Sequence, residues 1–160
     1  MRELIQSFKY RDRHEGLPLF ARWLKKAGAE LLADADLILP VPLYPTRLWR
    51  RRFNQSAMLA IALGRLAHVP VDCFVLNRAR RTASQVGLTA DQRRRNVAGA
   101  FKIDKASVPR LKGKKLVVVD DVITTGATAE ACARVLKRAG ADRVDILALA
   151  RVVEPTAFVL

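Results

Sequence analysis

The run from Val117 to Thr128, V-V-V-D-D-V-I-T-T-G-A-T, constrains the fold of this chain more than any other feature. Apolar β-branched residues predict a buried strand, and two adjacent acidic residues are expected to end it. A short loop of hydroxyl residues and glycine follows, and an amphipathic helix is expected from Ala127. A buried strand, a tight loop and a helix in this order form most of a βαβ unit, which favours a parallel sheet.

The rest of the chain continues this alternation of strands and helices. Helices are expected over 16–32, over 54–66 with Asn54 as the N-cap, over 90–96 and from 127. Strands or extended segments are expected over 37–39, 71–76, 100–103, 116–119 and 144–149, and an arginine-rich loop over 45–52. The pattern predicts an α/β fold with a mostly parallel central sheet flanked by helices. With 160 residues, 51% of them hydrophobic, we expect one domain over residues 1–160.

The loop after the predicted central strand has the chemistry of a sugar-phosphate site. Backbone N–H groups from Thr124 to Thr128 can bind an anion at a helix N-terminus, and Gly126 allows close approach of the backbone. The two acidic residues, Asp120 and Asp121, can accept hydrogen bonds from ribose hydroxyls. The glycine-rich phosphate motifs G-x-x-x-x-G-K-[ST] and G-x-G-x-x-G are absent from the sequence.

The formal charge of +14 is concentrated in two segments. Twelve Lys and Arg lie between Arg78 and Lys115, opposed there only by Asp91 and Asp104. A second cluster comprises Arg47, Arg50, Arg51 and Arg52. This density favours a polyanionic ligand, either pyrophosphate or nucleic acid. The alternative is a basic surface that only solubilises the chain.

Two further features bear on the compartment. No apolar run reaches the ~18 residues of a membrane span, and the N-terminus lacks the apolar stretch of a signal peptide. Cys73 and Cys132 share no metal-ligand spacing, and both are expected to be core thiols. We therefore expect a cytoplasmic protein that does not insert into a membrane.

The run from Val117 to Thr128 resembles the phosphoribosyl pyrophosphate (PRPP) signature of the type I phosphoribosyltransferases, a hydrophobic strand with two acidic residues and T-T-G-x-T. The resemblance implies that PRPP binds the acidic pair and the loop, that is Asp120, Asp121, Thr124, Thr125, Gly126, Ala127 and Thr128. Mg²⁺ is expected to arrive through PRPP oxygens, without a dedicated set of protein ligands. Direct ligation of Mg²⁺ by one of the two carboxylates is the alternative to ribose binding.

Three other segments are similar to the ComF (GntX-like) family of competence-associated, phosphoribosyltransferase-like proteins. They are L-P-V-P-L from Leu39 followed by Arg47 and R-F-N-Q from Arg52, then R-A-R from Arg78 with Gln85, and R-R-R-N-V from Arg93 with Ala100-Phe101. The resemblance places Val41, Pro42, Leu43, Arg47 and Arg52 near the pyrophosphate. It places Arg78, Arg80 and Gln85 on a mobile loop, and it implies catalytic roles for Asp120, Asp121 and Arg80.

The sequence departs from this family in two places. Arg52 stands where the family's R-G-F-N-Q segment has glycine, so the loop is expected to be shaped differently. Many members also carry an N-terminal zinc ribbon with paired C-x-x-C motifs, which this chain lacks. A shortened chain, a misassigned start codon and a short subgroup of the family are the three explanations.

Three functions are compatible with these features. The first is a phosphoribosyltransferase that uses PRPP, with Mg²⁺, and an unknown acceptor. The second is a non-catalytic protein that handles single-stranded DNA or binds partners of the uptake machinery, with PRPP as a regulatory ligand. The third is a transcription-linked regulator that senses PRPP. No hood segment for an acceptor base is recognisable, and Trp49 is either a stacking platform for a base or a packed surface anchor.

Overall fold

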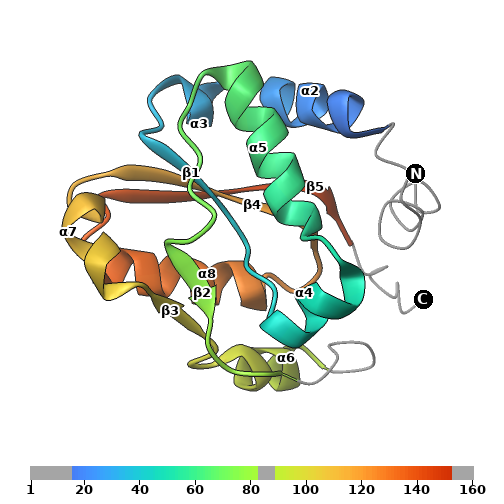
Figure 1. The fold of residues 1–160 in the computed structure, drawn as a ribbon, viewed down its shortest axis with the longest axis vertical. Helices are drawn as coiled ribbons and strands as arrows, with labels where there is room; N and C mark the ends of the chain where they lie inside the picture. Colours follow the sequence, from blue (N-terminus) through green and yellow to red (C-terminus); the bar gives the residue numbers. More distant parts are fainter. Residues whose placement is uncertain (1–15, 83–88, 153–160) are drawn as a thin grey trace, which may run out of the picture.

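A computed structural model describes residues 16–82 and 89–152. Its centre is a parallel sheet of three strands in the order β1-β4-β5 (Figure 1). The strands are β1 (Leu37–Pro40), β4 (Lys115–Ile123) and β5 (Arg143–Arg151). Leu37 pairs with Leu116, and Lys115 pairs with Arg143, so the three strands begin at the same edge of the sheet. The predicted parallel α/β architecture is confirmed.

Helices cover both faces of this sheet, because alternate residues of β4 point to opposite sides. Val117 and Val119 pack with Phe20, Leu59 and Leu63 in one core, while Leu116 and Val118 pack in a second core. The first core lies under α2 (Leu17–Ala27), α3 (Ala29–Ala33) and α5 (Gln55–Ala67), and the second under α6 (Ala90–Val97), α7 (Val108–Leu111) and α8 (Ala127–Arg138). Figure 1 shows the two layers above and below the sheet.

The expected strand over 71–76 is wrong in extent. Only Val71 forms a single parallel bridge, to Ile38. The chain then turns, because the Asp72 carboxylate accepts a hydrogen bond from the Phe74 N–H at 2.8 Å, as in Asx turns. Strand β2 (Leu76–Arg78) instead forms a separate antiparallel ribbon with β3 (Phe101–Ile103), which is followed by the short 3₁₀ helix η2 (Lys105–Ser107).

Two other predicted segments also differ from the structure. The predicted helix over 16–32 is divided at Gly28, where a Cβ would lie 2.7 Å from a methyl carbon of Leu147 on β5. The arginine-rich segment expected as a loop instead forms a helix, α4 (Pro45–Arg51). Proline at the first helical position suits a helix start, and Arg52 ends α4 in the left-handed region at φ 62°. No helix within 16–82 and 89–152 is long and apolar enough to cross a membrane.

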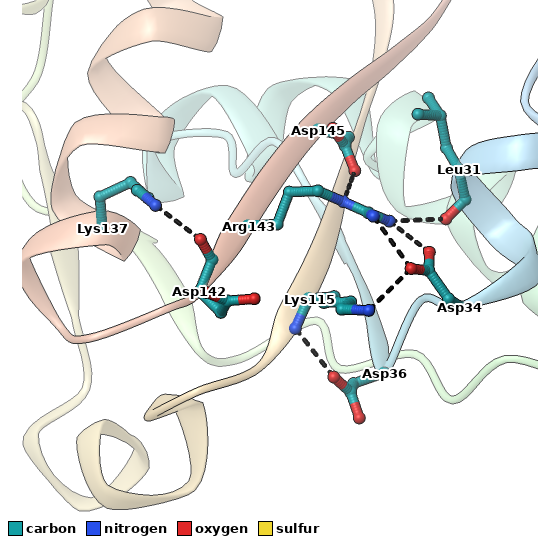
Figure 2. A network of polar contacts seen from close by, with 8 residues as sticks. All are labelled: Leu31, Asp34, Asp36, Lys115, Lys137, Asp142, Arg143 and Asp145. Carbon is teal, nitrogen blue, oxygen red and sulfur yellow. Dashed lines mark hydrogen bonds and ion pairs between the residues drawn. The ribbon is translucent and has the colours of Figure 1, made fainter.

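A network of ion pairs joins the amino ends of the three parallel strands (Figure 2). Asp34 is bound by the Lys115 ammonium at 2.8 Å and by the Arg143 guanidinium. Asp36, just before β1, accepts a hydrogen bond from the Lys115 N–H at 2.8 Å, and Arg143 also pairs with Asp145 at 2.7 Å. Each acidic residue here therefore has a cation or a backbone N–H beside it.

Candidate functional site

The two acidic residues lie within β4 and do not end it. Strand pairing continues past them, with Asp120 opposite Ala148 and Val122 opposite Ala150 on β5. Asp120 is only 8% exposed, and its Oδ1 accepts hydrogen bonds from the Ser56 hydroxyl at 3.1 Å and from the Asp121 N–H at 2.9 Å. Asp121 is half-buried, and its Oδ1 accepts from the Val122 N–H at 2.7 Å. Both carboxyl groups are thus oriented by hydrogen bonds.

Burial changes the acidity of Asp120. Removal of water from this carboxyl, and next the negative charge of Asp121, raise its pKa from 3.8 to about 7. The hydrogen bonds from the Asp121 N–H and the Ser56 hydroxyl act in the opposite direction. A carboxyl with a pKa near neutrality beside a second carboxyl is typical of functional sites.

The loop after β4 and the first turn of α8 enclose a small cavity. Its volume is about 30 Å³, and it is lined by Asp120, Val122, Ile123, Thr124, Gly126, Ala127, Thr128 and Ala129. Gly126 has φ 81°, in the left-handed region that favours glycine, and a Cβ there would meet no atom within 4 Å. Since the first N–H groups of a helix have no intrahelical acceptor, this open space before α8 suits an anion.

The segment after β1 is tied to the same region through the first turn of α5. The Val41 N–H donates to the Val119 carbonyl at 2.9 Å, which extends the β1–β4 pairing. The Val41 carbonyl accepts from the Asn54 amide at 3.0 Å, and the Asn54 Oδ1 accepts from the N–H groups of Ser56 and Ala57. The predicted N-cap at Asn54 is confirmed, and the same side chain also positions Val41.

Three of the remaining residues expected near the pyrophosphate line a second, larger cavity. Pro42, Leu43 and Arg52 line this cavity, whose volume is about 970 Å³, and Arg47 lies in α4. Arg52 occupies the position of the family's glycine and adopts a positive φ of 62°. The backbone therefore keeps the conformation that glycine favours, although an arginine occupies the position.

The three residues expected on a mobile loop do not lie together on one described loop. Arg78 lies in β2, not in a loop, and is 8% exposed, with its guanidinium carbon 5.3 Å from the centre of the Phe101 ring. Arg80 follows β2 and donates to the carbonyls of Asn96 and Ala98, at 2.9 and 2.8 Å, at the C-terminal end of α6. Gln85 lies outside the described residues.

Sequence reasoning missed two features of this region. Ser56 gave no signal as a partner of Asp120, because the two residues are distant in the sequence. The sequence left Trp49 as either a stacking platform or a packed surface anchor and did not single out Phe74, and the two side chains are 87% and 81% exposed. Cys132 is buried as expected, whereas Cys73 is half-buried in the wall of the larger cavity. Among the described residues, no group of three or more His, Cys, Asp or Glu could hold a metal ion.

Comparison with known proteins gives the same picture of the fold. The phosphoribosyl transferase domain matches residues 55–159. Purine phosphoribosyltransferase from Pyrococcus horikoshii aligns over 85% of this chain and 76% of its own, with a TM-score of 0.52 and 20% identity. This likeness supports the type I phosphoribosyltransferase fold, in agreement with the observed sheet.

Two curated relatives are similar along most of the chain. The DNA utilization protein YhgH of Escherichia coli O157:H7 is 38% identical over 156 residues, and Competence protein F of Haemophilus influenzae is 33% identical over 161. Each match covers 92% of this chain and 66% of the relative, so the chain spans slightly less than two thirds of their length. The chain belongs to the phosphoribosyl transferase domain family, and relatives named for competence and DNA utilization confirm its resemblance to the competence-associated proteins.

Proposed function

We propose that the carboxyl end of β4, including the small cavity before α8, binds PRPP and that the protein is a phosphoribosyltransferase with an unknown acceptor. The observation that carries the proposal is a cavity at the carboxyl end of the central strand, which is lined by Asp120, the left-handed Gly126 and the start of α8. In open α/β sheets, ligands bind at this end of the strands. The 5-phosphate would bind the N–H groups at the start of α8, and the ribose hydroxyls would donate to Asp120 and Asp121.

The proposed reaction is a substitution at C1 of the ribose. A nucleophilic atom of the acceptor forms a bond to C1 while the bond from C1 to the pyrophosphate oxygen breaks, and pyrophosphate leaves with both bonding electrons. The backbone from Val41 to Leu43, with Arg47 and Arg52, would lie beside the leaving group. Arg80 would neutralise its charge, which requires the guanidinium to leave the two carbonyls that it now binds.

The oxygen atoms at the proposed site are suitable ligands for Mg²⁺. The Asp120 and Asp121 carboxyl groups offer the hard oxygen atoms that Mg²⁺ prefers, and Mg²⁺ usually keeps several waters and binds substrate phosphates. When bound with PRPP, it would stabilise the negative charge that develops on the pyrophosphate.

The free thiols of Cys73 and Cys132 fit a reducing cytoplasm as the compartment.

Calorimetric titration of PRPP with Mg²⁺ tests the proposal. We expect Asp120→Ala and Asp121→Ala to abolish detectable PRPP binding, with circular dichroism unchanged. Asp91→Ala, on an exposed face of α6, is the matched control and should bind PRPP like the wild type. If both site variants bound PRPP with wild-type affinity, the assignment of this loop would be wrong.

A second candidate function, handling of single-stranded DNA with PRPP as a regulatory ligand, is favoured by the names of the relatives. PRPP titrations with and without a single-stranded oligonucleotide separate the two functions. A change in DNA affinity caused by PRPP would support the second function. PRPP binding that is independent of DNA would support the transferase.

A further inference from the structure

A groove of about 970 Å³ lies between α4 and residues 73–78. Trp49 from α4 and Phe74 both line it, and both expose more than four fifths of their surface. Leu48, on the same wall, is 42% exposed. Large aromatic side chains left in water forfeit the free energy that burial would provide, so a patch of this kind marks a contact surface.

The two aromatic residues are held on ordered backbone. The Phe74 N–H donates to the Asp72 carboxylate at 2.8 Å, and the Phe74 carbonyl accepts from the Asn77 amide at 2.9 Å. Arg110 holds the other Asp72 oxygen at 2.7 Å. Trp49 lies in the middle of α4, which begins with a hydrogen bond from the Leu48 N–H to the Tyr44 carbonyl. Both rings are therefore presented outward by local structure.

The polar part of the groove wall is basic and amide-rich. Arg52, Arg78, Asn54 and Asn77 line it, and no Asp or Glu does among the described residues. Three further arginines, at positions 47, 50 and 51, belong to the adjacent helix α4. The partner should therefore be anionic and should offer flat aromatic faces. A second copy of the chain, which carries +14, does not fit this requirement.

We propose that this groove binds single-stranded nucleic acid, with unpaired bases stacked on Trp49 and Phe74 and phosphates near Arg52. Stacking platforms combined with a basic groove are the means by which proteins hold single strands without reading their sequence. Duplex DNA hides its base faces, so it lacks the surfaces that the two rings would contact. The inference deepens the second candidate function and does not depend on PRPP binding.

A competing surface lies on the other side of the β2–β3 ribbon. A groove of about 500 Å³ between α6 and α8 is lined by Arg94, Arg95, Lys102, Arg134 and Arg138. It is basic, but its single aromatic residue, Phe101, is 3% exposed. This groove can attract phosphates but offers no stacking platform. It therefore provides the matched control for the proposal.

Tryptophan fluorescence gives a direct test, because Trp23 and Trp49 are the chain's two tryptophans. In a Trp23→Phe background, adding a short oligothymidylate should quench the emission of Trp49, and a duplex of equal length should leave it unchanged. Trp49→Ala and Phe74→Ala should each weaken oligonucleotide binding about tenfold. Circular dichroism should stay unchanged, since both side chains are exposed.

The control variant is Arg95→Glu with Arg138→Glu in the second groove. The proposal is overturned if this double variant abolishes binding while Trp49→Ala and Phe74→Ala bind like the wild type. It is also overturned if Trp49→Ala changes only the oligomeric state in light scattering. Pro42, Leu43 and Arg52 line this groove and are also proposed to lie beside the pyrophosphate, so PRPP is titrated without oligonucleotide. Trp49 and Phe74 are not among the proposed PRPP residues, so Trp49→Ala and Phe74→Ala should bind PRPP like the wild type, and a loss of PRPP binding in Asp120→Ala alone reports on the proposed function separately.

Discussion

The two ends of the parallel sheet use acidic residues in opposite ways. At the amino end, Asp34 and Asp36 lie beside cations and backbone N–H groups, which hold the pKa of both carboxyls below the usual range. The largest cause is the Arg143 side chain for Asp34 and the Lys115 N–H for Asp36. At the carboxyl end, burial raises the pKa of Asp120 to about 7. Residues of one type are therefore stabilising at one edge and costly at the other.

The difference separates the structural acids from those of the proposed site. Charged Asp34 and Asp36 favour the folded state, because the fold supplies their partners. Charged Asp120 opposes folding, because the fold removes its water and places Asp121 beside it. Such a cost is typical of groups that bind a ligand, which supports the proposed site at the carboxyl end of the sheet.

The largest effect is expected for Asp120→Asn. The amide keeps an acceptor for the Ser56 hydroxyl but carries no charge, so the free energy of unfolding at pH 8 should rise by up to about 4 kcal/mol, at 1.36 kcal/mol per pKa unit. PRPP affinity should fall about 10- to 100-fold, because hydrogen bonds to a charged acceptor are lost. Urea denaturation and calorimetry measure the two effects. If Asp120→Asn were less stable than the wild type and bound PRPP with wild-type affinity, the contrast between the two ends of the sheet would be wrong.

The pH dependence of stability should distinguish the two ends. The folded state binds a proton at Asp120 between about pH 4 and pH 7 that the unfolded state has released. The contribution of Asp120 therefore lowers stability as pH rises through this window. Asp34 and Asp36 have lowered pKa values, so their stabilisation is lost as pH falls below about 4. Denaturation series at several pH values measure this dependence. The decrease in the free energy of unfolding between about pH 4 and pH 7 should be present in the wild type and absent from Asp120→Asn.

A smaller effect is expected for Asn54→Asp. The carboxylate still accepts from the N–H groups of Ser56 and Ala57, so α5 stays capped, but the donor to the Val41 carbonyl is lost. PRPP affinity should fall about tenfold while the free energy of unfolding changes by less than about 1 kcal/mol. Asn54→Ala, which removes both functions, is the comparison variant. Equal affinity for Asn54→Asp and the wild type would show that this link does not position the site.

Arg52→Gly should raise stability slightly. Glycine adopts φ 62° without the steric cost that a Cβ imposes, so the free energy of unfolding should rise by about 1 kcal/mol. His68→Gly, at φ 57° after α5 and away from the site, is the control for the backbone effect alone. A loss of stability at Arg52, with a gain at His68, would mean that the Arg52 side chain stabilises the fold by contacts.

The smallest effect is expected at the amino end, for Arg143→Met. The ion pairs to Asp34 and Asp145 are partly exposed, so Tm should fall by only a few degrees, on the order expected for surface pairs. The difference from the wild type should shrink as NaCl is raised, because salt screens such pairs. PRPP binding should not change. A loss of PRPP affinity would contradict the separation of the two ends.

The sequence predicted the elements whose signals are local. The β-branched run before Asp120, the glycine before α8 and the Asn54 cap each depend on neighbouring residues, and each was predicted within a few positions. The strand expected over 71–76 failed because the Asp72 side chain turns the backbone at Phe74. The loop expected over 45–52 failed because Pro45 and six residues after it are compatible with a helix.

The sequence by itself determined the α/β alternation, the phosphate-type loop and the basic charge, because periodicity, loop chemistry and composition can be read along the chain. Only the tertiary structure decided which carboxylate is buried, which acids are paired and which aromatic rings face solvent. Ser56 meets Asp120, and Asp34 meets Arg143, across gaps of 64 and 109 residues. Contacts of this range depend on how strands and helices pack, and no local pattern encodes them.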